Sequence, residues 1–123
     1  MRNSYLLTMT FFVLHQMDAA YWHEWNMFLD IPPGGIQGYL AYNLILMPIF
    51  FIGYKNVIES GEHACKYSYF CGGIGVLVLL VHGSFMLAGY DEFKLPFSIA
   101  IIALCFLSGS WQIRQTFIAS RPG

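Results

Sequence analysis

Hydrophobic side chains fill four long stretches of the chain, at about residues 5–28, 36–54, 71–89 and 96–113. A helix needs roughly 20 mostly apolar residues to cross about 30 Å of hydrocarbon, and each stretch comes close to that length. Turn-forming residues separate the stretches: two prolines and two glycines follow Ile31, Asp91 and Glu92 precede the last stretch, and Pro96 begins it. The pattern predicts an all-α fold, a single integral membrane domain built as a bundle of four transmembrane helices.

The composition supports a membrane protein and excludes several other classes. Of the 123 residues, 57% are hydrophobic and only 11% are charged, and the mean hydropathy is +0.55. Such a chain has too few polar side chains for a water-facing surface. Its net charge of -1 gives no basic surface for nucleic acid, so nucleic-acid binding is excluded. A chain of 14.0 kDa also has no room for a separate catalytic domain, so any function resides among the hydrophobic segments.

The basic residues predict how the helices cross the membrane, because cytoplasmic loops retain Lys and Arg. Only Lys94 falls in a loop on the outer side, whereas the other five lie at the two ends and in the middle connector: Arg2, Lys55, Lys66, Arg114 and Arg121. We therefore expect a multi-pass protein of the bacterial inner membrane, with both termini cytoplasmic and the lipid bilayer as its surroundings. A secretory signal ending near Asp18 is the alternative for the first stretch, but the run continues into aromatic residues and favours a retained helix.

Ionisable side chains are rare inside the apolar stretches, and they mark the candidate functional positions. Such a group costs several kcal/mol in lipid unless it faces the bundle interior and finds a partner. The first stretch contains His15 and Asp18, and the third contains His82. At 1.5 Å per residue, both histidines lie roughly 15 Å from the cytoplasmic edge of their stretch. Asn43 and Cys105 fall near the same level in the other two stretches, so the pattern predicts a polar layer near the bilayer centre.

The rotation of the residues around each helix predicts which groups meet. Asp18 lies about 60° from His15 and one turn farther out. Gly75 and Gly89 stand seven residues before and after His82, and such small residues let a neighbouring helix approach closely. We predict that the first helix covers this stripe and that the two histidines point into one cavity. Their ring nitrogens should lie about 3 to 5 Å apart, with Asp18 at the outer rim.

Two imidazoles and a carboxylate form a sufficient ligand set for zinc or another divalent metal. His15, Asp18 and His82 are therefore the candidate metal ligands, and Asn43 is expected to support the two histidines in the cofactor-binding site. Asp18 and Glu24 are the candidate catalytic groups. Glu24 lies at the outer interface, where it would either guard an entrance to the site or remain a solvated side chain. The reaction that these residues favour is metal-centred chemistry on a small molecule or a lipid.

Other functions remain open at this point. A b-type haem held between His15 and His82 is the second cofactor that the pattern allows, and it would make the protein an electron carrier. Alternatively, the polar groups only fix the helix register in a small transporter, a homo-oligomeric scaffold or a subunit of a larger membrane complex. The three cysteines, Cys65, Cys71 and Cys105, form no C-x-x-C pair and disfavour a thiol–disulfide enzyme.

The segment from His15 to Trp25 carries the motifs His-x-x-Asp-Ala and Tyr-Trp-x-Glu-Trp, and Pro33, Gly34 and Gly35 follow. These motifs resemble a family of small bacterial four-helix membrane proteins of unknown function. The resemblance implies a four-helix membrane fold and no particular activity. The histidines of the first and third stretches are also similar to the ligand arrangement of membrane metal-dependent hydrolases, which are larger and supply more ligands.

Overall fold

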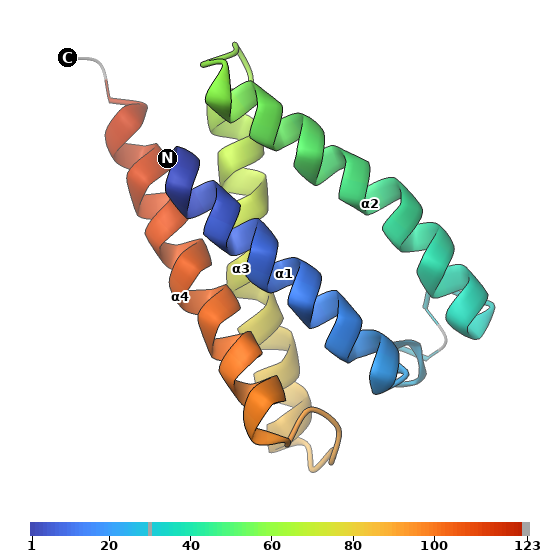
Figure 1. The fold of residues 1–123 in the computed structure, drawn as a ribbon. Coiled ribbons are helices and arrows are strands. Elements are labelled where there is room, and N and C mark those ends of the chain that lie inside the picture. The colour runs from blue at the N-terminus through green and yellow to red at the C-terminus, as the bar shows by residue number, and fades with distance from the viewer. Residues whose placement is uncertain (30, 122–123) are drawn as a thin grey trace.

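The computed structural model describes residues 1–29 and 31–121, and this part of the chain is all-helical. Its elements are α1 (Arg2–Tyr21), the short 3-10 helix η1 (Glu24–Asn26), α2 (Gly35–Ile58), α3 (Ala64–Leu87) and α4 (Pro96–Ala119). Figure 1 shows α1 in front of α3, with α4 on one side and α2 on the other. The two termini and the α2–α3 connector lie at one end of the bundle, and the other two connectors lie at the opposite end.

Three of the described helices, α2, α3 and α4, are long and apolar enough to cross a membrane by length and composition. Each has 24 residues and is therefore about 36 Å long, which exceeds the hydrocarbon thickness. The expectation of a membrane protein is confirmed at this level. The 20 residues of α1 include Arg2, His15 and Asp18, and this helix is not one of the three.

The third helix begins earlier than the hydrophobic pattern predicts. It starts at Ala64 rather than near Cys71, because the polar segment before Cys71 continues the helix beyond the apolar run. The earlier start moves the middle of α3 away from His82, which lies five residues before the last helical residue, Leu87, or about 8 Å from that end. His15 lies about 9 Å before the end of α1 at Tyr21. The two histidines do share a level, but this level is closer to one end of the bundle than to its middle.

Glycines bring α3 and α4 into close contact. A Cβ atom added to Gly109 would lie 2.6 Å from the carbonyl oxygen of Gly72, and one added to Gly75 would lie 2.7 Å from that of Cys105. Both distances are shorter than a Cβ contact can be, so each position requires a residue without a side chain. Gly75 also faces Thr8 of α1, whose Cγ2 atom would lie 2.9 Å from the added Cβ. The predicted close approach is thus found at Gly75, with α4 as well as α1 against it. It is not found at Gly89, which lies beyond the end of α3 and where an added Cβ would have no neighbour within 4 Å in the described structure.

Polar side chains at the same interface bond to one another, although Gln112 Oε1 is buried without a hydrogen-bond partner among the described residues. The hydroxyl oxygens of Ser68 and Thr116 lie 2.6 Å apart, and Gln112 Nε2 donates to the carbonyl oxygen of Ser68 at 2.9 Å. One face of α4 turns inward, and its polar and thiol side chains are all buried: Ser98, Cys105, Ser108 and Gln112. These groups hold α3 and α4 in register.

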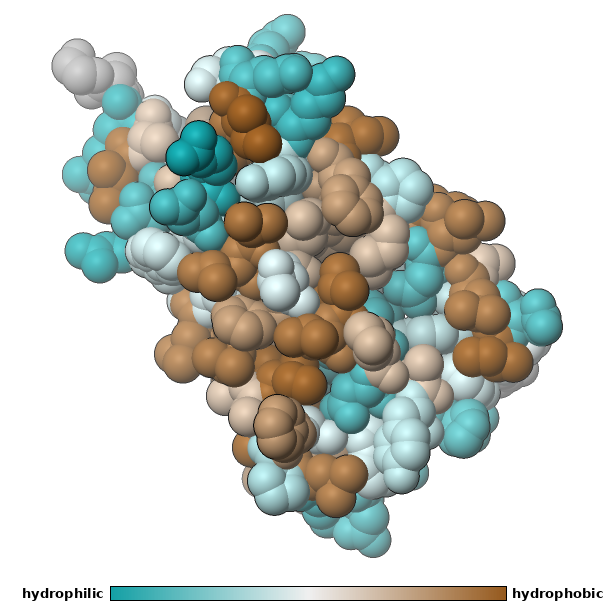
Figure 2. All heavy atoms as spheres, viewed as in Figure 1, coloured by the Kyte–Doolittle hydropathy of each residue, from teal (hydrophilic) through white to brown (hydrophobic). Residues whose placement is uncertain are grey.

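The outer surface of the bundle is largely apolar. Figure 2 shows hydrophobic side chains over the middle of the helices and hydrophilic ones gathered mainly at their ends. Large aliphatic residues such as Leu44, Ile45, Leu80 and Leu107 are exposed by more than half of their surface. A surface of this kind is typical of helices in contact with lipid.

Candidate metal centre

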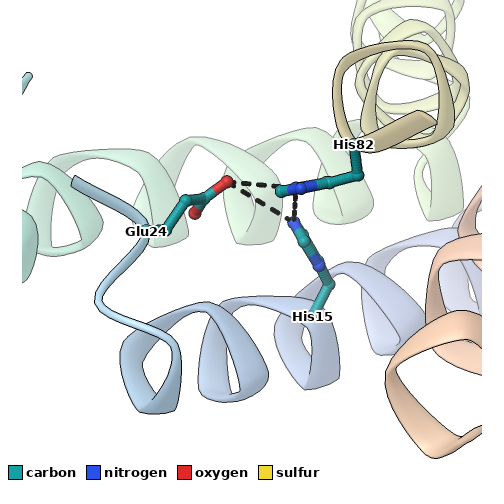
Figure 3. A group of neighbouring side chains, drawn as sticks. All are labelled: His15, Glu24 and His82. Atoms are coloured by element: carbon teal, nitrogen blue, oxygen red, sulfur yellow. Dashed lines mark hydrogen bonds and ion pairs between the residues drawn. The ribbon is translucent and has the colours of Figure 1, made fainter. Parts of the chain in front are cut away.

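The two histidines of the apolar segments meet inside the bundle. The Nε2 atoms of His15 and His82 lie 3.1 Å apart, and each residue is only 2% exposed (Figure 3). Their rings contact edge to face, with centroids 4.7 Å apart. Both residues line the same cavity. The predictions that α1 lies against α3 and that the two imidazoles point into one cavity are confirmed.

Glu24 supplies the carboxylate, and a reversal of the chain after α1 places it there. α1 ends at Tyr21, His23 adopts a left-handed conformation with φ 54°, and η1 begins at Glu24. The Glu24 Oε1 atom lies 3.1 Å from His82 Nε2 and 4.0 Å from His15 Nε2 (Figure 3). Its side chain is 12% exposed. Glu24 was expected either to guard an entrance to the site or to remain a solvated side chain. The arrangement favours a role at the site.

Trp25 holds this short segment in place. Its side chain is buried, and its ring packs against that of Tyr39 on α2 with centroids 5.4 Å apart. The Tyr39 hydroxyl in turn contacts Gln16 of α1, donating to its backbone carbonyl at 3.0 Å and lying against its side-chain oxygen. Trp25 therefore ties the segment after α1 to α2. Tyr39 in turn ties α2 to α1 beside the cluster.

Phe93, in the loop between α3 and α4, covers the cluster. Its side chain is fully buried, with its ring centroid 4.3 Å from that of His82 and 5.7 Å from that of His15. Its φ of 61° is unusual for a bulky residue, and such backbone strain, on the order of 1 to 3 kcal/mol, persists only where the surroundings enforce it. In the same loop the exposed Lys94 ammonium donates to Asp91 at 2.6 Å and lowers the pKa of that carboxyl. Sequence reasoning missed Phe93, because one phenylalanine among eleven carries no signal of its own.

The predicted ligand Asp18 lies elsewhere, against α4. Its Oδ1 atom accepts a hydrogen bond from the Ser98 hydroxyl at 3.0 Å, and that hydroxyl oxygen accepts one from Trp22 Nε1 at 3.2 Å. The rotation of about 60° between His15 and Asp18 is enough to direct one toward α3 and the other toward α4. Ser98 belongs to the first turn of α4, where the positive end of the helix dipole favours a carboxylate. Glu24 thus takes the place expected for Asp18 beside the two histidines.

Asn43 is also outside the cluster. Its Nδ2 atom donates to the carbonyl oxygen of Tyr39, one turn earlier in the same helix, at 3.0 Å. Within the described residues, Asn43 is not part of the cavity wall, whereas Tyr39 is. Of these two α2 residues, Tyr39 is therefore the one beside the site. The expected support of the histidines by Asn43 is not seen in this arrangement.

The cluster stands at the wall of a cavity of about 370 Å³, which α1, α2, α3 and the segment after α1 enclose. This volume lies within the range of roughly 300 to 1,000 Å³ that is typical of small-ligand sites. Apolar side chains such as Phe12, Phe28 and Val78 form most of its wall. The polar atoms of the cluster therefore converge on one part of an otherwise apolar space.

The three ligand atoms fit a single divalent ion. Atoms at about 2.0 to 2.2 Å from a tetrahedral ion lie about 3.3 to 3.6 Å from one another, and those of His15, Glu24 and His82 lie 3.1, 3.1 and 4.0 Å apart. Each imidazole directs its Nε2 atom at the cluster, while both Nδ1 atoms are buried without a hydrogen-bond partner among the described residues. Two imidazoles and a carboxylate that converge on one point are also a donor set that suits a divalent cation.

The same distances argue against a haem between the histidines. Two nitrogens on opposite sides of a haem iron lie about 4 Å apart with the macrocycle between them. The two Nε2 atoms are 3.1 Å apart, and the Glu24 carboxylate and the Phe93 ring occupy the adjoining space. This arrangement does not fit the haem alternative.

Comparison with known proteins places the chain in a family. Residues 1–119 match the model described as "Family of unknown function (DUF6713)". The chain belongs to this family. No curated protein and no solved structure matches it. The expectation of a family without a known activity is confirmed, and the function of this DUF6713 protein has to be argued from its own side chains.

Proposed function

We propose that this protein is a four-helix membrane protein that binds one divalent transition metal ion, zinc or ferrous iron, through His15, Glu24 and His82. The observation that carries the proposal is the convergence of three ligand atoms, all within 4.0 Å of one another, at the wall of a cavity. Two histidines and one carboxylate form the ligand set of catalytic zinc sites and of non-haem iron sites.

The proposal includes α1 as a fourth membrane span. This helix packs against each of the other three. Its His15 and Asp18 are directed toward neighbouring helices, so they lower its hydropathy without meeting lipid. With five of the six basic residues at the termini and the α2–α3 connector, the termini would be cytoplasmic in a bacterial inner membrane. The metal site would then lie toward the outer side of the membrane.

The chemistry that fits the site is metal-assisted conversion of a small molecule or a lipid. Three protein ligands leave a coordination position open for water or a substrate oxygen, and a bound ion would polarise a carbonyl or lower the pKa of water there. The residues of the chain would act as follows: His15 and His82 hold the ion as neutral imidazoles, Glu24 balances its charge, and Phe93 excludes water from one side. Of the two catalytic candidates, Asp18 would then act only by tying α1 to α4.

A titration with Co²⁺, which absorbs visible light strongly when four-coordinate, tests the proposal. We expect the purified protein in detergent to bind about one ion per chain and to develop this absorption. The substitution Glu24→Gln keeps the shape of the side chain and removes its charge, so it should weaken Co²⁺ binding by at least tenfold.

Glu62→Gln provides the matched control, because Glu62 is exposed in the connector between α2 and α3. It should bind Co²⁺ as the unchanged protein does. Equal affinity of the Glu24→Gln and Glu62→Gln variants, or no absorption with the unchanged protein, would contradict the proposal and leave the cluster as a structural contact in a scaffold or transporter.

A further inference from the structure

The cavity has a polar end and an apolar end, and it extends along α3. Its α3 wall runs from His82 to Ile74, eight residues apart, which corresponds to about 12 Å along the helix. The cluster lies at the end nearer to the loops after α1 and α3. Between His82 and Ile74 the α3 wall consists of aliphatic residues, Leu77, Val78 and Val81. The space therefore changes from polar to apolar as it passes from the end of the bundle toward its middle.

The cavity also opens on the side of the bundle. Leu77 on α3 and Tyr42 on α2 line the cavity, yet they are 53% and 43% exposed. Both belong to helices that are apolar and long enough to cross a membrane. Figure 1 shows α2 meeting α3 near their connector and diverging from it toward the other end of the bundle. The opening thus lies between two helices, where the surroundings are lipid.

The polar end lies at a depth that matches the polar groups of a lipid. α3 is about 36 Å long and exceeds the hydrocarbon thickness by a few ångströms at each end. His82, about 8 Å from the helix end, is therefore close to the boundary between headgroups and acyl chains. A single-chain lipid in the bilayer has the same orientation as the cavity, with its oxygen-bearing group at this boundary and its hydrocarbon toward the middle.

From these observations we infer that the cavity takes a single acyl chain from the membrane, with its carboxyl or ester group at the His15–Glu24–His82 cluster. The chain enters between α2 and α3 and lies along Leu77 and Ile74. This inference rests on the proposed metal site, to which it adds the substrate class. A cavity of about 370 Å³ is of the size that one such chain requires.

Photolabelling with a medium-chain fatty acid that carries a diazirine near its methyl end tests the inference. In the purified protein, labelling should concentrate on the segment from Ile74 to Val78. Leu77→Trp narrows the opening and should reduce this labelling roughly tenfold. The matched control is Leu80→Trp, because Leu80 lies on the same helix, is 60% exposed and is not part of the described cavity wall. It should retain labelling within about twofold.

Co²⁺ titration of the same samples separates this inference from the proposed function. If the protein binds Co²⁺ but the label spreads evenly over exposed residues, or falls equally in both tryptophan variants, the acyl-chain inference is wrong and the metal site stands. If labelling concentrates in the cavity but no Co²⁺ binds, the metal site is wrong and the cavity remains a chain-binding site. Concentrated labelling that only Leu77→Trp reduces, together with Co²⁺ binding, supports both.

Discussion

Two regions of this bundle contain buried polar groups, and they use them in opposite ways. Between α3 and α4 the backbones meet at Gly72 and Gly109, and Ser68, Gln112 and Thr116 bond to one another and to the backbone. Between α1, α2 and α3 the helices leave a cavity, and the ionisable side chains converge at its wall. The first region is filled, whereas the second is open.

The two regions differ in the chemistry of their polar groups. The serine, glutamine and threonine side chains of the first region hydrogen-bond mainly to partners that α3 and α4 supply. Those of the second region are two imidazoles and a carboxylate, whose Nε2 and Oε1 atoms converge within 4.0 Å of one another at the cavity wall. Hydrogen bonding between helices explains the first region, and for the second we propose metal binding.

The largest expected effect concerns the open region. His82→Ala or His15→Ala should lower the affinity for Co²⁺ at least about a hundredfold, because each removes one of three protein ligands. His63→Ala is the matched control, since His63 is exposed at the start of α3 and should change the affinity less than twofold. Calorimetric titration of the three variants measures the difference, and a common small effect would remove the distinction between the two regions.

The next effect concerns the filled region. Gly109→Ala should destabilise the protein by about 1 to 3 kcal/mol, because its Cβ would lie 2.6 Å from the Gly72 carbonyl oxygen. Gly83→Ala should be neutral or stabilising by up to about 1 kcal/mol, since its Cβ has no neighbour within 4 Å in the described structure. Thermal unfolding in detergent compares the two. Equal stability of both variants would mean that α3 and α4 do not meet at these glycines.

A smaller effect is expected where the open region joins α4. Asp18→Asn weakens the charge-assisted bond with Ser98 and should lower stability by about 1 kcal/mol, with Co²⁺ affinity changed less than threefold. Unfolding and titration of one preparation give both numbers. A loss of Co²⁺ binding as large as that of the histidine variants would restore Asp18 to the ligand set.

The smallest effect is expected at Asn43, whose described side-chain hydrogen bond stays within its own helix. Asn43→Ala should change stability by less than about 0.5 kcal/mol and leave Co²⁺ affinity unaltered. The same two measurements apply. A clear loss of Co²⁺ binding would show that Asn43 supports the histidines after all.

The sequence predicted the part of this arrangement that depends on periodicity. The shared level and inward faces of His15 and His82 follow from helical geometry alone, and so does the buried face of α4. The distance of His82 from the middle of α3 did not follow, because the polar residues after Ala64 lengthen the other end of the helix without an apolar signal.

The residues that the sequence did not place at the cluster are the ones that loops position. Glu24 reaches the histidines only because His23 adopts a left-handed backbone conformation. Phe93, which covers the histidines, adopts a left-handed conformation itself. Helical periodicity contains no information about these turns. Asp18 is the expected ligand because it lies one turn from His15 on the same side of the helix, although the rotation of about 60° directs it to a different neighbour.

Elemental analysis tests the central claim most directly. The protein is purified in detergent, loaded with zinc or ferrous iron, and passed through a desalting column beside the His82→Ala variant. We predict about one metal ion per chain in the unchanged protein and less than about a tenth of that in the variant. An unchanged protein that retains no more metal than His82→Ala would contradict the account.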